Sequence, residues 1–312
     1  MPGIHRELGP VELAAALASF RRDGFIVFEG LLSAADSGQL RQEILRCEEV
    51  QAALDGGCEV LGREVGAQPL TSLYSMGSAT SLDSSAHHWL EPGSLSDRLA
   101  DPPLIRGLLR HIIGPTFHLS TAGAGVKGRD TPSLRFHQDH WHWRSDYPVN
   151  LAARDSPYLQ LLWYPDGFAV KDASLMVVPG SHAIDPLIVE PLPFAYIKDA
   201  ETKLLATHGL SPVELAPMPP GSLVFMNART YHAVTPKPAS SPTALRLSCK
   251  YTYKGPGPPM AGTMIVPEGL LRAAREGDDP VRRMLLEREA FTYEAWGMPP
   301  DDTIIGMPAP KL

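Results

Sequence analysis

The chain has only three cysteines in 312 residues, and they lie far apart at Cys47, Cys58 and Cys249. No two of them have the Cys-x-x-Cys spacing of a structural zinc site, and an odd count does not fit a disulfide scaffold. We therefore expect reduced thiols that serve as structural side chains, as is usual in cytoplasmic proteins.

Long basic runs and long apolar runs are also missing. The net charge is -7, and no Lys/Arg-rich stretch could neutralise a row of phosphates. No stretch reaches the roughly 18 uninterrupted apolar residues of a membrane span, and the start lacks the three regions of a signal peptide. We therefore expect a cytoplasmic protein, monomeric or homodimeric, that contacts neither nucleic acid nor membrane.

Proline and glycine, by contrast, are abundant, with 31 and 27 residues. They separate short apolar segments and form no repeat, a pattern typical of many short strands joined by turns. Apolar residues make up 44% of the chain, which is enough to build a large core.

The N-terminal third reads mainly as helix. Residues 10–22 have the apolar spacing of an amphipathic helix that ends at Asp23-Gly24, and residues 25–28 are rich in strand-forming side chains. A second helix is expected to begin at Ser33, and another to span residues 102–113.

From about residue 117 to 253 the pattern changes to short apolar or alternating runs separated by turn residues. The clearest runs are 158–164, 174–178, 222–226 and 244–253. Two short helices follow residue 267, the second with Asp279 as its cap and Pro280 at its first position.

Helices, then strands, then helices, without β-α-β alternation, predict a mainly β fold with flanking helices. The expected core is a double-stranded β-helix, the jelly roll of cupin-like proteins. We expect a single domain over residues 1–312, with a helix-and-strand part (1–116), the jelly-roll core (117–256) and a C-terminal helical extension (257–312).

The chemistry-bearing pattern begins at His137-Gln138-Asp139, in an expected strand from Leu134 to Asp139. Residues two apart in a strand project from the same face, so an imidazole and a carboxylate can reach one ion. Two imidazoles and one carboxylate on one face of an octahedral ion are the ligand set of non-haem Fe(II) oxygenases.

The second imidazole must come from elsewhere in the core, and His232 is the best candidate because it follows the strand-like run 221–226. Arg246 lies fourteen residues further on. It shares one face of the next strand with Ser248, and its guanidinium could clamp a carboxylate through two parallel hydrogen bonds.

The chain resembles the phytanoyl-CoA dioxygenase family of Fe(II)- and 2-oxoglutarate-dependent oxygenases. The stretches that carry the resemblance are FRRDGFIVFEGLLSAAD, RFHQDHWHW, DASLMVVPGSH, GSLVFMNARTYHAVTP and ALRLSCKY. One departure lies before Pro-Gly-Ser-His, where the family has Asn-Gly-Pro/Ala-Leu and this chain has Asp172-Ala173-Ser174-Leu175. The departure concerns the conformation of the local turn and not the site residues.

The resemblance implies that His137, Asp139 and His232 hold catalytic Fe(II) and that Arg246, with Ser248 beside it, binds 2-oxoglutarate. The reaction would use O2, release succinate and CO2, and oxidise an unactivated C–H bond of a small organic substrate, such as one in natural-product biosynthesis. Hydroxylation is the expected outcome, and desaturation, cyclisation or epoxidation need only another substrate pose.

Further side chains are candidates for the surrounding pocket. Lys127, Gln160 and Ser174 lie on strands expected beside the site and could contact the co-substrate, or could be ordinary strand or loop residues. Aromatic, cationic and imidazole side chains that could line the substrate cavity or pack the core are His140, Trp143, Arg144 and Trp163.

Three alternatives stay open. His140 and His142 form a His-x-His pair of the kind that cupin-like metal sites use, which would suit a redox-neutral isomerase or hydrolase. A phytanoyl-CoA-like enzyme acting on an acyl-CoA would need more basic residues around the pocket mouth than Arg129, Arg135 and Arg144. A non-catalytic binding module would not need an intact ligand set.

Overall fold

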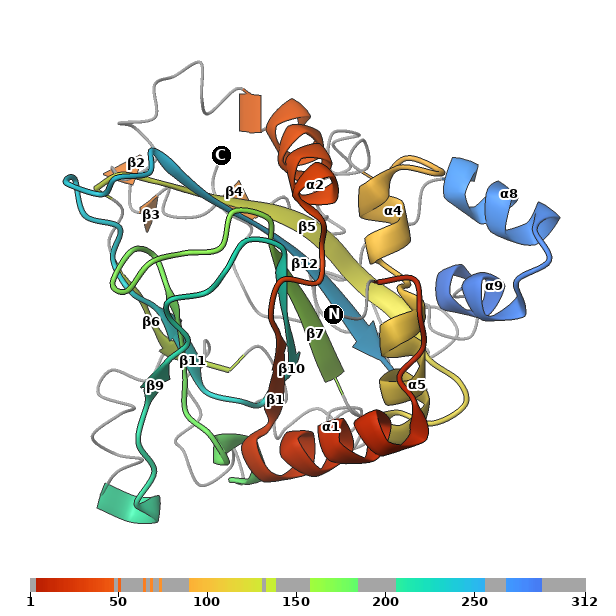
Figure 1. Cartoon of the computed structure of the whole chain (residues 1–312), viewed down its shortest axis with the longest axis horizontal. Helices are drawn as coiled ribbons and strands as arrows, with labels where there is room; N and C mark the ends of the chain where they lie inside the picture. Colours follow the sequence, from red (N-terminus) through yellow and green to blue (C-terminus); the bar gives the residue numbers. More distant parts are fainter. Residues whose placement is uncertain are drawn as a thin grey trace.

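The computed structural model describes residues 4–47, 50–51, 64–65, 68–69, 73–74, 90–130, 133–138, 158–184, 206–255 and 268–287. Two antiparallel sheets form a jelly roll (Figure 1). The large sheet contains, in spatial order, β1 (Phe25–Phe28), β10 (Ser222–Asn227), β7 (Tyr158–Tyr164), β12 (Leu245–Lys254), β5 (His118–Gly128) and β4 (Leu73–Tyr74). The small sheet contains β6 (Leu134–His137), β11 (His232–Val234), β8 (Leu175–Val177) and β9 (Val213–Glu214), and β2 (Glu64–Val65) pairs with β3 (Gln68–Pro69).

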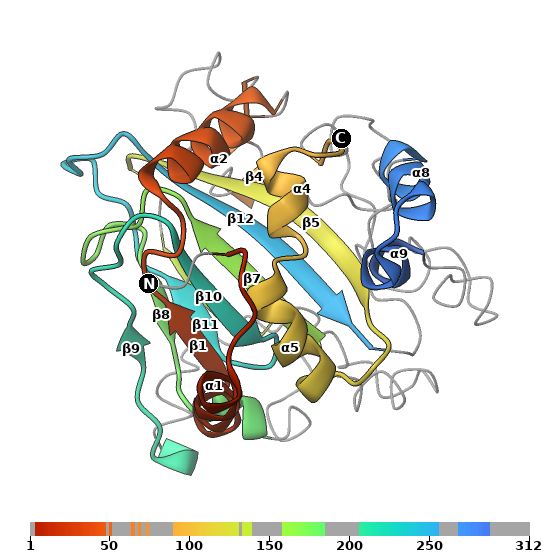
Figure 2. The ribbon, with the colours of Figure 1, turned by 45° about the vertical axis from the view of Figure 1, so that its right-hand side comes forward.

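Helices cover the outer face of the large sheet, and Figure 2 shows α4 and α5 lying across it. The helices are α1 (Pro10–Asp23), α2 (Ala34–Arg46), α4 (Leu95–Leu99), α5 (Pro103–Ile112), α8 (Glu268–Glu276) and α9 (Pro280–Leu286). A 3-10 turn, η3, spans Ser181–Ala183. No helix in the described ranges has the length and apolar character needed to cross a membrane.

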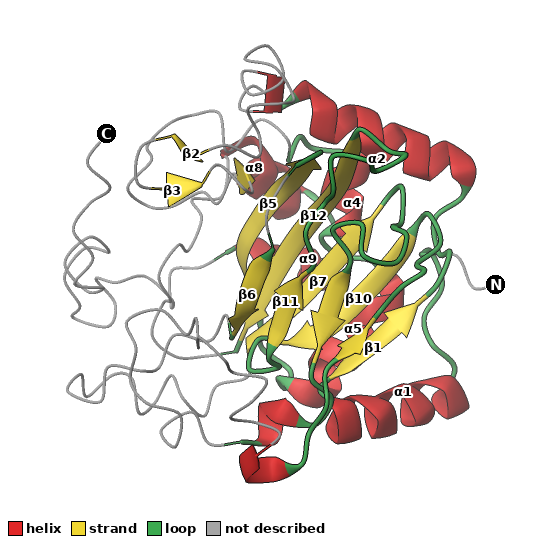
Figure 3. Ribbon diagram, turned by 90° about the vertical axis from the view of Figure 1, so that its left-hand side faces the viewer, coloured by secondary structure: helices red, strands yellow, loops and turns green. Residues whose placement is uncertain are grey.

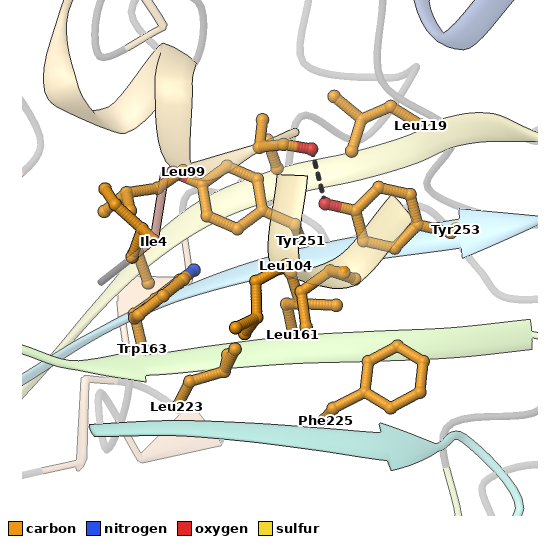
Figure 4. Packing of buried hydrophobic residues seen from close by; sticks show 14 of the residues in the cluster. Ile4, Leu99, Leu104, Leu119, Leu161, Trp163, Leu223, Phe225, Tyr251 and Tyr253 are labelled. Atoms are coloured by element: carbon orange, nitrogen blue, oxygen red, sulfur yellow. Dashed lines mark hydrogen bonds between the residues drawn. The ribbon is translucent and has the colours of Figure 1, made fainter. Parts of the chain in front are cut away.

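Successive residues of β12 point alternately toward the covering helices and toward the interior between the two sheets. Its odd-numbered residues from Leu247 to Tyr253 lie in the core beneath the helices. The Tyr253 hydroxyl donates to the Ala100 carbonyl at 2.6 Å, and the Tyr251 hydroxyl donates to the Ser96 carbonyl at 2.6 Å, so the apolar face is also tied to α4 (Figure 4). The even-numbered residues therefore face the interior between the two sheets.

A second apolar cluster fills part of that interior. It joins Leu162 and Val224 of the large sheet to Leu175, Val177 and other residues of the small sheet. The small sheet thus packs on the side of the large sheet opposite α4 and α5, as Figure 3 shows. This arrangement leaves the interior face of β5 and β12 to polar side chains.

The sequence-based assignments are confirmed for most long elements. The Ser33 hydroxyl accepts a hydrogen bond from the Asp36 amide at 3.0 Å and begins α2, and the Asp279 carboxylate accepts from the Val281 amide at 2.9 Å and begins α9. The prediction of a mainly β jelly roll with flanking helices is confirmed as well. The N-terminal part also contributes a strand to the large sheet, because β1 pairs with β10.

Both described cysteines are buried and neither forms a disulfide. Burial raises the pKa of the Cys249 thiol. Cys58 lies outside the described residues. For Cys47 and Cys249 the expectation of reduced, structural thiols agrees with this burial.

Gly24 ends α1 in a left-handed conformation with φ 86°. Glycine is needed at this position because two neighbouring side chains approach its Cα closely. A Cβ at this position would lie 2.5 Å from the His182 Nδ1 and 2.5 Å from the Thr230 Oγ1. We expect Gly24→Ala to lower the free energy of unfolding by at least about 2 kcal/mol, from backbone strain and overlap together. Urea denaturation measures the change.

Gly38 in α2 provides the matched control, because a Cβ there has nothing within 4 Å. Gly38→Ala should raise the free energy of unfolding by about 0.5–1 kcal/mol, as alanine does in a helix interior. Equal effects of the two substitutions would show that the contacts of Gly24 do not matter.

Candidate active site

The site is built first from two neighbouring strands of the small sheet. β6 ends at His137, β11 begins at His232, and the register places these two residues directly opposite each other. Directly opposed positions of an antiparallel pair lie on the same face, with Cβ atoms about 4.5–5.5 Å apart. Two residues separated by ninety-five positions in the sequence are thus opposed across neighbouring strands of the sheet.

The His232 ring is buried, and its orientation is fixed by one hydrogen bond. Nδ1 lies 2.9 Å from the Thr230 carbonyl oxygen, which can only accept, so Nδ1 carries the proton and the lone pair is on Nε2. A backbone carbonyl that holds the second nitrogen of a histidine is the usual support for a metal ligand. The Thr230 hydroxyl in turn donates to the Gly24 carbonyl at 3.1 Å.

Two further contacts position the start of β11. The Ser181 hydroxyl, in the Pro-Gly-Ser-His turn, accepts from the Tyr231 amide at 2.9 Å and donates to the Val178 carbonyl at 2.6 Å. The buried Gln138 side chain donates to the Arg229 carbonyl, so the residue after His137 is tied to the loop that precedes His232. The Pro-Gly-Ser-His turn therefore supports the strand that carries His232.

Asp139, the predicted third ligand, lies outside the described residues, as do His140, His142, Trp143 and Arg144. Their roles stay predictions. Within the described part of the chain no three His, Cys, Asp or Glu side chains gather in a way that could hold a metal ion. A site that needs Asp139 would not be found in that set.

Arg246 lies on the interior face of β12 and is 4% exposed. Its Nε donates to the Ala173 carbonyl at 2.9 Å, and one terminal nitrogen donates to the Ser248 hydroxyl at 3.0 Å. The guanidinium carbon lies 5.1 Å from the centre of the Tyr164 ring, within the range of a cation–π contact. The guanidinium is therefore held in place with donors left for an anion.

Lys127 lies directly opposite Arg246 in the β5–β12 ladder and is 2% exposed. Its Nζ has no hydrogen-bond partner among the described residues. Burial, and the charge of Arg246 beside it, lower the pKa of Lys127 to about 7. Two buried cations side by side without a described carboxylate form a site that an anion would stabilise.

The turn that presents the Ala173 carbonyl to Arg246 is where the chain departs from the family sequence. Ala173 has a φ of 51°, a conformation that glycine adopts without strain, and glycine is the residue that the family has there. A buried ion pair fixes the turn, because the Lys237 ammonium lies 2.7 Å from the Asp172 carboxylate. The local turn therefore forms despite the altered residues.

Two other predicted site residues, Gln160 and Ser174, are buried in different parts of the fold. Gln160 is buried on the interior face of β7, opposite Thr252. Ser174 is fully buried, and its hydroxyl contacts the Glu214 carboxylate at 2.5 Å and the Thr235 hydroxyl at 2.7 Å, so it joins three segments of the small sheet. The Ser174 hydroxyl is thus engaged in the sheet itself.

Trp163 was expected either to line the substrate cavity or to pack the core, and the structure places it in the core. It lies on the outer face of β7, fully buried in the core beneath the helices, where Figure 4 shows it near Leu99 and Leu104. Adjacent strand residues point to opposite faces, so its neighbour Tyr164 is the one that meets Arg246. The sheet therefore does not bring Trp163 to the predicted substrate cavity.

The pair His137 and His232 and the pair Lys127 and Arg246 lie at neighbouring positions along the interior. Arg246 is bonded to Ala173, just before β8, and His232 is opposite Val177 in the same strand. Four residues of strand correspond to about 13 Å. A metal ion on the histidines and a small dicarboxylic keto acid between it and the cations would fit this separation.

Comparisons with known proteins agree with this arrangement. The sequence model described as phytanoyl-CoA dioxygenase (PhyH) matches residues 20–237. A search of curated proteins found no match to the chain. Similar solved structures exist, although all those compared below are under 25% identical and so establish the fold alone.

One is the epimerase SnoN from nogalamycin biosynthesis, in complex with Fe3+, α-ketoglutarate and nogalamycin RO, with 20% identity and a TM-score of 0.54 over 80% of this chain and 85% of that one. Another is EctD from S. alaskensis with 2-oxoglutarate and 5-hydroxyectoine, with 19% identity and a TM-score of 0.54 over 82% and 81%. A third is the non-heme α-ketoglutarate-dependent carbocyclase SnoK, with 17% identity and a TM-score of 0.51 over 80% and 85%.

The family model covers more than two thirds of the chain and includes both opposed histidines. It also includes the Pro-Gly-Ser-His turn that supports β11. The resemblance expected from the sequence is confirmed: the chain belongs to the phytanoyl-CoA dioxygenase family of Fe(II)- and 2-oxoglutarate-dependent enzymes.

Proposed function

We propose that this protein is a non-haem Fe(II)- and 2-oxoglutarate-dependent oxygenase that hydroxylates an unactivated C–H bond of a small organic metabolite. The observation that carries the proposal is the buried pair of cations, Lys127 and Arg246, in the same interior as the opposed histidines. Buried cations without a described counter-ion suit an anionic co-substrate, and paired histidines suit a metal.

The residues fit the proposed metal. His232 is held as the Nδ1–H tautomer that binds a metal through Nε2, and His137 occupies the opposed position. Asp139 follows two residues later in the sequence and would supply the carboxylate. When bound, the iron supplies the reduction of O2 that is coupled to the conversion of 2-oxoglutarate to succinate and CO2 and to oxidation of the substrate.

The chain's own residues would bind and orient the co-substrate. Arg246, held by the Ala173 carbonyl and the Ser248 hydroxyl, would donate to the carboxylate of 2-oxoglutarate that is remote from the keto group. Lys127 would add a second charge-assisted hydrogen bond, and the anion would favour its protonated form. The apolar cluster around Leu162 and Val224 would exclude water from the remaining wall.

Hydroxylation and natural-product biosynthesis are the finer parts of the proposal. The similar folds include an epimerase and a carbocyclase from nogalamycin biosynthesis, which supports a role in specialised metabolism and shows that one fold accommodates several outcomes. Hydroxylation needs only one substrate C–H bond beside the iron. We propose it because it makes the fewest demands on the substrate.

Measurement of succinate tests the function directly. Protein supplied with Fe(II), 2-oxoglutarate and O2 should release succinate slowly without a substrate and faster with a member of a metabolite library that it hydroxylates. Zn(II) in place of Fe(II) should stop succinate release. A catalytic activity that Zn(II) supports and 2-oxoglutarate does not affect would instead favour a redox-neutral enzyme.

A further inference from the structure

The interior face of β12 carries more cations than the co-substrate needs. Beyond Arg246 and Ser248, the even-numbered residues are Lys250, Thr252 and Lys254. The pairing of β12 with β7 runs from Cys249 to Lys254 without a register shift. The pairing with β5 shifts between Thr252 and Tyr253, where β5 has one extra residue, so the alternation along β12 itself continues. Lys254 therefore shares the interior face with Arg246, while its neighbour Tyr253 points to α4.

Lys254 is fully buried, yet its ammonium nitrogen has no hydrogen-bond partner among the described residues. The register places it beside His118 of β5 and Tyr158 of β7, neither of which carries a negative charge at neutral pH. Burial lowers the pKa of Lys254 to about 8. A buried ammonium with no counter-ion in the described part of the chain marks a place where an anion would be stabilised.

This place is separate from the co-substrate site. Lys254 is eight residues from Arg246, or about 26 Å along the strand, which is much longer than 2-oxoglutarate. β11 and β12 are joined by residues 235–244, and the Ala173 amide bonds to the Pro236 carbonyl in that connection. β11 therefore ends, and β12 begins, at the end of the interior where Arg246 lies.

The position of His232 along the interior follows from the same connection between β11 and β12. His232 is opposite Val177, about 13 Å from the Arg246 end, whereas Lys254 lies about twice as far from it. The metal-ligand level therefore lies between Arg246 and Lys254. A molecule held at Lys254 would approach that level from the side opposite the co-substrate.

We propose that Lys254 forms a second anion-binding subsite, which holds an acidic group of the organic substrate on the side of the histidine pair away from Arg246. Its role as a substrate subsite rests on the proposed function, whereas anion binding at Lys254 does not. Lys250 lies on the same face of β12 and is half-buried. The substrate class is thus a carboxylic acid or a phosphate ester.

The test uses protein loaded with Mn(II) and saturated with 2-oxoglutarate, so that the Arg246 site is filled. Benzoate, phenyl phosphate and neutral benzamide are the probes, and calorimetry gives their dissociation constants. We expect at least one anion to bind more tightly than benzamide, Lys254→Met to weaken it at least tenfold, and Lys254→Arg to retain it within about threefold. The tighter anion distinguishes a carboxylate from a phosphate site.

Lys171→Met is the matched control, because it removes the same charge from an exposed lysine and should leave binding unchanged. Removal of a buried, uncompensated charge should also raise the melting temperature of the ligand-free Lys254→Met protein. Equal affinity of wild type and Lys254→Met, or no anion binding by the wild type, would overturn the inference. Failure of 2-oxoglutarate to bind, measured in the loading step, would instead count against the proposed function.

Discussion

Replacing Arg246 with methionine is expected to weaken 2-oxoglutarate binding by about 30-fold or more, because truncation of a buried, charge-paired group costs about 2–5 kcal/mol. The guanidinium is held in position by the Ala173 carbonyl and the Ser248 hydroxyl. The dissociation constant of 2-oxoglutarate, measured by calorimetry on Mn(II)-loaded protein, gives the effect. Mn(II) affinity should be unchanged, since Arg246 is not a ligand.

Arg246→Lys is the informative control. It keeps the charge but loses the planar guanidinium that presents two parallel N–H donors. We therefore expect an affinity between those of the wild type and Arg246→Met. An unchanged dissociation constant in Arg246→Met would place the co-substrate elsewhere in the interior.

Lys127 gives the same site a pH signature. Its pKa of about 7 in the free protein would rise when a carboxylate binds beside it. Binding would then take up a proton above pH 7, and 2-oxoglutarate affinity should fall with increasing pH, by up to about tenfold per unit. Lys127→Met should bind more weakly and lose this dependence.

Replacing His232 with alanine is expected to abolish Fe(II)-dependent succinate release and to weaken Fe(II) binding by more than 100-fold. The loss of a ligand should exceed the 10–100-fold loss that follows removal of an outer-shell partner. Metal content after gel filtration and succinate formation measure the two effects. Thermal unfolding checks that the variant remains folded.

The control for His232→Ala is His208→Ala, which removes an exposed histidine outside the sheets. It should change neither metal content nor succinate release. Retention of stoichiometric Fe(II) by His232→Ala would contradict the assignment of His232 as a ligand, and loss of metal from both variants would show that the loss is not specific to His232.

Much of the fold could be predicted because local signals were strong. The run at 158–164 is rich in strand-forming side chains and became β7, and Asp279 before Pro280 began α9 as capping chemistry requires. α4 was missed because five residues show too little periodicity to reveal a helix. β1 could be predicted as a strand, but its partner β10 lies two hundred positions away in sequence, and no local pattern specifies that pairing.

The site could be predicted in part for the same reason. Alternation alone predicts that Arg246 and Ser248 share one face, and the same count extended along β12 also puts Lys254 on that face. Trp163 could not be placed without the sheet, because a strand buried on both faces has no polar side to mark its orientation. Ser174 required knowledge of Glu214 and Thr235, which reach it only through tertiary pairing.

The central claim is that the opposed histidines and the buried cations hold Fe(II) and 2-oxoglutarate together. Visible absorption of the anaerobic protein tests it most directly. Addition of 2-oxoglutarate to the Fe(II)-loaded wild type should produce a weak charge-transfer band, which His232→Ala should lack and Arg246→Met should show only at much higher 2-oxoglutarate concentrations. A wild type that binds both components and shows no band would contradict the account.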